Sequence, residues 1–146
     1  MSVAVQVAGI VPVRLDLNHL GAPEQQLGMS LGTVLVYLRT AGTARTVAEG
    51  WGRAAVLARS LSVAVAGRRP LVVVGPSTIA AIVQLAGVPQ VTAEYEPSRA
   101  DGAAAMLRIQ VGPVEWQVRD ANAYTSMLRA WRQAARLLGE NPTEYE

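Results

Sequence analysis

The chain contains no cysteine, no lysine and no phenylalanine, and His19 is its single histidine. Without cysteine it can form no disulfide, no thiolate metal ligand and no thiol nucleophile. Without lysine it has no side chain for Schiff-base catalysis. Any Ser-His-acid or histidine-metal mechanism would have to pass through His19. These absences argue against most enzyme classes, so we expect a non-enzymatic protein with no catalytic residues, no metal and no cofactor.

Charged residues are also scarce, at 16% against 51% hydrophobic residues, a balance typical of a folded globular protein. No run approaches the ~18 apolar residues of a membrane span, and the first residues lack the basic region that opens a signal peptide. We therefore expect a cytoplasmic protein with no membrane partner. All thirteen Lys and Arg residues are Arg, which suggests a GC-rich genome, that of a high-GC bacterium or its phage.

The length of 146 residues fits one domain that buries roughly two thirds of its unfolded surface. We assign residues 1–139 to this domain and residues 140–146 to an acidic flexible tail. The tail holds Glu140, Glu144 and Glu146, so thirteen Arg face eight acids in the remainder. The body is therefore moderately basic.

The clearest local pattern predicts a β-hairpin around Gly112-Pro113, a two-residue loop. Glycine supplies the positive φ that a type II′ turn requires at its first central position. This register places three apolar pairs on one face: Val111 with Val114, Ile109 with Trp116, and Leu107 with Val118. One register therefore satisfies both the alternation and the cross-strand pairing.

A helix follows the hairpin, with Asp120 as its N-cap and Gly139 at its end. Its apolar residues recur at spacings of three and four, which is typical of a helix with one buried face. They are Tyr124, Met127, Leu128, Trp131, Ala135 and Leu138. The opposite side carries Arg129, Arg132 and Arg136.

The remaining segments complete an α+β pattern. Alternation predicts a strand over residues 3–17, bent or divided at Gly9 and Pro12. The next segments are a polar loop (18–30), a strand (31–39), a helix starting at Thr43 or Thr46 and reaching residue 65, a strand (71–75), a short helix ending at Ala86 and a strand (88–96). The order β-β-α-β-α-β-β-β-α has no internal repeat and indicates a mostly antiparallel sheet with helices packed on one face.

Two polar features offer candidate ligand sites. Ser77 and Thr78 follow Gly75-Pro76 at the start of the predicted short helix, where backbone amides can bind an anion. An ordinary helix cap explains them more simply, because no phosphate-loop or dinucleotide motif accompanies them. His19 lies in the polar loop with no recognisable metal spacing. We keep Ser77, Thr78 and His19 as the candidate anion or small-ligand residues.

The acidic pair Glu94 and Glu96 shares one face of a predicted strand. Two carboxylates at this spacing resemble a general acid/base pair, but a solvated polar face has the same pattern. We favour the solvated face.

Arginines at helical spacing form the strongest basic feature. Arg129, Arg132 and Arg136, extended by Arg119, could track phosphates or an acidic protein. No aromatic residue interleaves them and no known nucleic-acid motif accompanies them. A solvated helix face is the favoured interpretation, and a nucleic-acid or acidic-partner site is the alternative.

Apolar residues exceed what one small core requires. Trp51, Trp116 and Trp131 are expected to cluster in the core, whereas Val56, Val63 and Ile10 project from other faces. Surplus apolar surface usually marks a partner site. We therefore expect a homo-oligomeric interaction or regulatory protein, most simply a dimer. The alternatives are a nucleic-acid-binding accessory protein and a small-ligand-binding domain.

Overall fold

The computed structural model describes residues 3–18, 25–63, 71–74, 81–97 and 105–139. Within these ranges the α+β class is confirmed. The elements, in chain order, are β1 (Val3–Ala8), β2 (Val13–Asn18), β3 (Gln26–Leu31), β4 (Val34–Leu38), α1 (Ala41–Arg53), α2 (Ala55–Ala58), β5 (Leu71–Val74), β6 (Ala81–Leu85), β7 (Val91–Glu96), β8 (Met106–Val111), β9 (Val114–Val118) and α3 (Ala121–Gly139).

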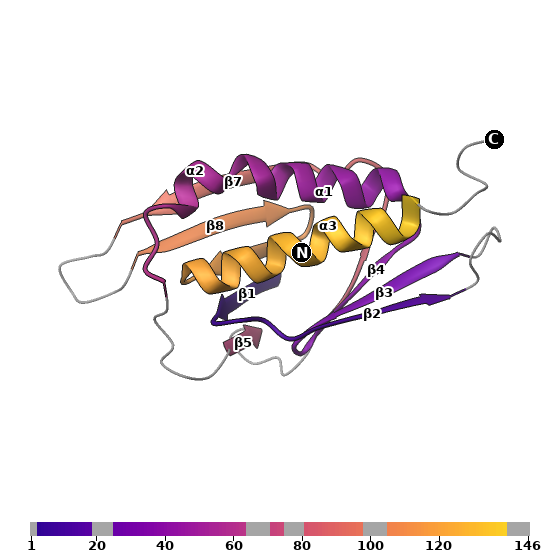
Figure 1. Ribbon diagram of the computed structural model, residues 1–146, viewed down its shortest axis with the longest axis horizontal. Helices are drawn as coiled ribbons and strands as arrows, with labels where there is room; N and C mark the ends of the chain where they lie inside the picture. Colours follow the sequence, from indigo (N-terminus) through magenta and orange to yellow (C-terminus); the bar gives the residue numbers. More distant parts are fainter. Residues whose placement is uncertain (1–2, 19–24, 64–70, 75–80, 98–104, 140–146) are drawn as a thin grey trace.

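The strands form two sheets instead of one. One sheet has the order β5-β1-β9-β8-β7 and the other β2-β3-β4-β6. Most neighbouring strands are antiparallel, whereas β1 with β9 and β4 with β6 are parallel. The helices α1 and α3 pack along each other in opposite directions (Figure 1).

The C-terminal hairpin and helix match the sequence-based prediction. Ile109 pairs with Trp116, and the other predicted pairs of β8 and β9 are also present. Gly112 has a φ of 52°, in the left-handed region that the turn requires. Asp120 caps α3, because its Oδ1 accepts a hydrogen bond of 2.8 Å from the backbone N–H of Ala123.

Three predicted segments are corrected. Residues 81–85 form the strand β6 and not part of a helix, and residues 26–30 of the predicted loop join Leu31 in the strand β3. The N-terminal alternation is divided into β1 and β2 at Gly9 and Pro12, which is one of the two arrangements that the sequence left open. The long helix begins after Thr40, whose side chain accepts a hydrogen bond from the N–H of Thr43, and it is interrupted at Ala54.

An internal repeat, contrary to the sequence-based prediction, organises the whole fold. Both β3-β4-α1 and β8-β9-α3 consist of a hairpin followed by a helix, and residue n of the first corresponds to residue n + 80 of the second, as Gly32 to Gly112. The strands β1 and β2 correspond to β6 and β7 at n + 78. Identical pairs in the hairpin-helix units are Leu27/Leu107, Gly32/Gly112, Val34/Val114, Arg39/Arg119, Ala41/Ala121, Trp51/Trp131, Ala54/Ala134, Ala55/Ala135 and Leu57/Leu137.

Backbone hydrogen bonds repeat with the same correspondence. The N–H of Gly32 donates to the carbonyl of Pro12 at 3.0 Å, and the N–H of Gly112 donates to the carbonyl of Gln90 at 3.3 Å. The N–H of Val3 donates to Pro113, as that of Ala81 donates to Thr33. Positive-φ glycines also correspond, Gly9 to Gly87 and Gly32 to Gly112. The repeat is therefore structural as well as sequential.

The two halves exchange their first strands. From the N-terminal half, β1 pairs with β9, where Val3 lies opposite Val114. From the C-terminal half, β6 pairs with β4, where Ala81 lies opposite Val34. Reciprocal exchange of this kind is the arrangement of a twofold-symmetric, strand-swapped dimer, here contained within one chain. The additional strand β5 pairs with the free side of β1.

One hydrophobic core joins both halves. The inward faces of both sheets and the facing sides of α1 and α3 contribute to a single buried cluster. Trp51, Trp116 and Trp131 lie at its centre, fully buried and in mutual contact, as expected. Each sheet thus has one inner face in this core and one outer face.

Candidate functional site

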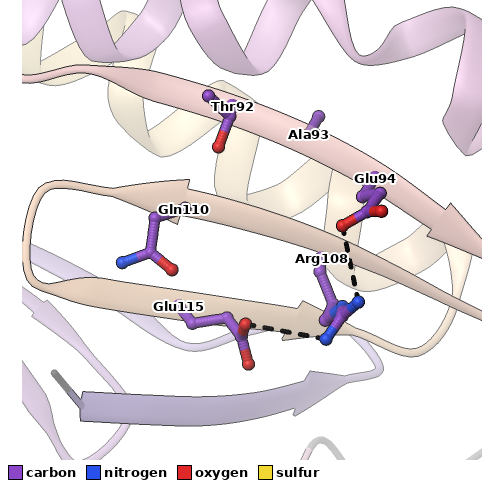
Figure 2. A pocket seen from close by; sticks show the side chains of 6 residues that line it. All are labelled: Thr92, Ala93, Glu94, Arg108, Gln110 and Glu115. Atoms are coloured by element: carbon purple, nitrogen blue, oxygen red, sulfur yellow. Dashed lines mark hydrogen bonds and ion pairs between the residues drawn. The ribbon is translucent and has the colours of Figure 1, made fainter.

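The outer face of the five-stranded sheet holds a polar recess, which we call the sheet recess. It has a volume of about 360 Å³ and is lined by Thr92, Ala93, Glu94, Arg108, Gln110 and Glu115 (Figure 2). These residues come from β7, β8 and β9. Strand alternation places the polar side chains on the outer face, because their neighbours Leu107, Ile109 and Trp116 point into the core.

Arg108 is the centre of the sheet recess. Its guanidinium lies 2.8 Å from Glu96, 3.4 Å from Glu94 and 4.0 Å from Glu115. The Arg108 side chain is 34% exposed, so water screens these pairs and each contributes little to stability. Because Glu94 and Glu96 share one arginine, the arrangement supports the interpretation of a solvated polar face over an acid/base pair.

The outer side of α3 forms a second recess, which we call the helix recess. Its volume is about 430 Å³, and its lining residues are Thr125, Leu128, Arg129, Arg132, Gln133 and Arg136. The helical spacing predicted from sequence brings three of the four candidate arginines together here. No carboxylate is among these six residues. The helix recess therefore presents positive charge that can attract an anionic group.

Arg119 lies apart from the other three arginines. It follows β9 and precedes the cap of α3, and its backbone N–H donates to the carbonyl of Val7 at 2.9 Å. It does not line the helix recess. A third recess of about 250 Å³ between α1 and α3 includes Arg132 together with Arg45 and Glu49. Arg132 therefore lines both of these recesses, whereas Arg119 lines neither.

Tyr124 links α3 to α1. Its hydroxyl donates a hydrogen bond to the carbonyl of Trp51, and its ring stacks on that indole at a centroid distance of 6.0 Å. Burial raises the pKa of Tyr124, and the charge of Arg132 opposes this shift. Burial therefore favours the neutral, hydrogen-bond-donating form of the phenol.

The three residues predicted for self-association are all exposed. Ile10 and Val63 are each 70% exposed and Val56 is 66% exposed. The N–H of Gly9 donates to Asp120, and the carbonyl of Val63 accepts from Asn122, so Ile10 and Val63 both adjoin the N-terminus of α3. Val56 lies on α2.

Two further large apolar residues are more than two thirds exposed and were not predicted from sequence. Ile82 on β6 is 75% exposed, and Val88 just beyond that strand is 84% exposed. The alternation of Ile82 and Gln84 with the buried Val83 and Leu85 would have revealed Ile82, had residues 81–85 been assigned to a strand.

The candidate anion or small-ligand residues His19, Ser77 and Thr78, and the tail at residues 140–146, lie outside the described residues. Within the described ranges, no group of three His, Asp or Glu side chains is placed to hold a metal ion. No helix in the same ranges has the length and apolar character needed to cross a bilayer.

Known proteins provide no template for these sites. The chain matches no protein-family model, no curated protein and no solved structure. The candidate surfaces are therefore the sheet recess, the helix recess and the exposed apolar residues, each assigned from its own geometry.

Proposed function

We propose that this protein is a non-enzymatic, cytoplasmic interaction or regulatory protein of a high-GC bacterium or its phage, and that it acts as a homodimer. The observation that carries the proposal is the set of large apolar side chains on its surface. They are Ile10, Val56, Val63, Ile82 and Val88, each at least 66% exposed. These side chains project away from a core that already contains three tryptophans.

A stable dimer interface must bury several of these residues together. Covering one large aliphatic side chain contributes about 1.5–3 kcal/mol, whereas association costs at least ~4 kcal/mol of translational and rotational freedom. One exposed valine therefore cannot hold a dimer, but a surface with several such residues can. Ile10 and Val63, which adjoin the same helix end, meet this condition in part.

Sedimentation equilibrium across micromolar concentrations tests the proposal. We expect a reversible equilibrium between the 15.4 kDa chain and its dimer. Ile10→Glu and Val56→Glu then show whether the surface includes these two residues, because a buried unpaired carboxylate weakens an interface strongly. A single 15.4 kDa species at every concentration would contradict self-association.

The helix recess favours a second candidate function, binding of nucleic acid or an acidic protein. Arg129, Arg132 and Arg136 line one recess without a carboxylate, and phosphate contacts need such a cluster. Binding to random-sequence DNA should weaken with salt, and replacing each arginine by glutamine should reduce the salt slope by about 1. Arg59→Gln, an equal charge change at the end of α2, is the matched control. Equal losses in the recess variants and the control would indicate attraction by net charge alone.

A small-ligand function stays a prediction. Its sequence-based candidates, His19, Ser77 and Thr78, lie outside the described residues. Native mass spectrometry of the purified protein would detect a bound compound as added mass. A mass equal to that of the chain alone in every charge state would argue against a tightly held ligand.

A further inference from the structure

The internal repeat identifies an open edge on the four-stranded sheet. Strand β1 has a neighbour on each side, parallel β9 and antiparallel β5. Its counterpart β6 has parallel β4 on one side, and no strand of the described residues occupies the other. No strand of the described residues therefore takes, beside β6, the position that β5 takes beside β1.

The sequence of β6 makes this edge suitable for strand pairing. Protected sheet edges usually carry lysine, proline or inward-pointing charges. Ala81–Leu85 reads AIVQL and has none of these. Val83 and Leu85 point into the core, and Ile82 is 75% exposed on the outer face. Without such protection, β6 can accept another strand.

The outer face next to the edge is also more apolar than the corresponding face of the five-stranded sheet. Ile82 lies opposite Leu35, and Gln84 lies opposite Tyr37, on the neighbouring strand β4. The corresponding positions of β9 are Glu115 and Gln117. The two outer faces have therefore diverged, and the apolar one adjoins the open edge.

We infer that a second copy of this chain adds its own β6 antiparallel to β6, which joins the two four-stranded sheets into one continuous sheet. The inference rests on the proposed homodimer and identifies its surface. A twofold axis relates two copies of one strand in the antiparallel orientation, which is the orientation of β5 on β1. Pairing of the two β6 strands also covers the open edge of each copy at the same time.

The repeat also fixes the register. Strand β5 lies opposite Val5 to Ala8, which correspond to residues 83–86. A twofold axis at Gln84 places Gln84 opposite the partner's Gln84 and Val83 opposite the partner's Leu85. In this register apolar residues pair on the inner face and the two amides pair on the outer face.

A cysteine crosslink tests this register directly, because the chain has no cysteine of its own. Directly opposed residues of antiparallel strands have Cα atoms about 4.5–5.5 Å apart, within the range of a disulfide. Gln84→Cys should therefore give a disulfide-linked dimer under mild oxidation. Gln6→Cys is the matched control, since Gln6 corresponds to Gln84 but lies between β9 and β5. It should remain uncrosslinked.

A charge on the edge tests the same inference independently of oxidation. Ile82→Lys changes an exposed side chain and should fold normally, which circular dichroism and thermal melting check; Gln84→Lys serves as a second variant. We expect the dimer dissociation constant of each to rise about tenfold or more in sedimentation equilibrium. A dimer that survives both lysine substitutions, and that Gln84→Cys fails to crosslink, would overturn the β6 interface and leave the proposed self-association standing. A wild-type monomer at every concentration would instead overturn the proposed function itself.

Discussion

Trp51 and Trp131 occupy corresponding positions in the two halves of the chain, and their ring centroids lie 6.3 Å apart. Trp116 contacts both rings in an edge-on geometry, at 6.4 Å and 6.3 Å. Such aromatic pairs contribute about 0.5–1.5 kcal/mol beyond their buried area. The contact between corresponding residues places the centre of the internal symmetry inside the core, so both halves build one aromatic cluster.

Loss of one indole from this cluster should be costly. Trp131→Ala is expected to lower the free energy of unfolding by about 3–5 kcal/mol, because Trp131 is fully buried and leaves a cavity. Urea denaturation measures the change. Trp51→Ala should give a similar loss, since Trp51 is also fully buried and belongs to the same aromatic cluster. A loss below ~1 kcal/mol for either variant would place that indole outside the core.

Asp120 should contribute more than an ordinary helix cap. Its carboxylate accepts from the N–H of Ala123 at 2.8 Å and from that of Gly9 at 3.0 Å, and the side chain is fully buried. Asp120→Ala leaves two N–H groups without this acceptor and should cost about 2–3 kcal/mol. Thr40→Ala, at the corresponding cap of α1, should cost about 1 kcal/mol. Equal losses in urea denaturation would mean that the bond to Gly9 contributes nothing.

Gly50 allows α1 to approach β7 closely. A Cβ added at Gly50 would lie 2.4 Å from Cγ1 of Val91, which is too close for two carbon atoms that are not bonded to each other. Gly50→Ala should therefore destabilise by about 1–3 kcal/mol, although alanine is the better helix former. Adding Val91→Ala should recover part of this loss in a double-mutant cycle. Additive losses would show that the two residues do not compete for space.

Tyr124 should make stability depend on alkaline pH. Burial raises its pKa above the ordinary value of about 10, so the unfolded chain releases the phenolic proton first. The stabilisation is complete below pH 10 and is lost as the pH rises from there toward the folded-state pKa. Urea midpoints between pH 8 and 11 should fall for the wild type and fall less for Tyr124→Phe. Parallel curves would exclude Tyr124 as the cause.

Local patterns predicted the C-terminal part of the fold correctly. The β8–β9 hairpin depends on a two-residue loop and adjacent strands, and α3 depends on a cap and a regular apolar stripe. Both signals lie within a few residues of the structure that they specify. The helix recess follows from them, because helical spacing alone brings Arg129, Arg132 and Arg136 together.

Non-local pairing accounts for what the sequence patterns missed. Residues 81–85 are a short apolar run, which periodicity cannot distinguish from a buried helix segment; parallel pairing with β4 from the other half makes them a strand. Glu94, Arg108 and Glu115 meet only because β7, β8 and β9 adopt a particular register. The sequence patterns did not reveal the internal repeat for two reasons. Few corresponding residues of the two halves are identical, and the offset between corresponding residues changes from 78 to 80.

The exchange of first strands also determines when the chain can fold during synthesis. Strand β1 is synthesised long before β9, the strand with which it pairs, because Val3 lies opposite Val114. Strand β4 is likewise synthesised before its partner β6. Until then the N-terminal half carries an apolar strand without its parallel neighbour and a sheet without its last strand. Pairing over such long sequence separations is slow to form and exposes the nascent chain to aggregation. The four-stranded sheet can be complete only after translation has passed Leu85, and the five-stranded sheet only after Val118, so neither half reaches its native state until most of the chain has been made.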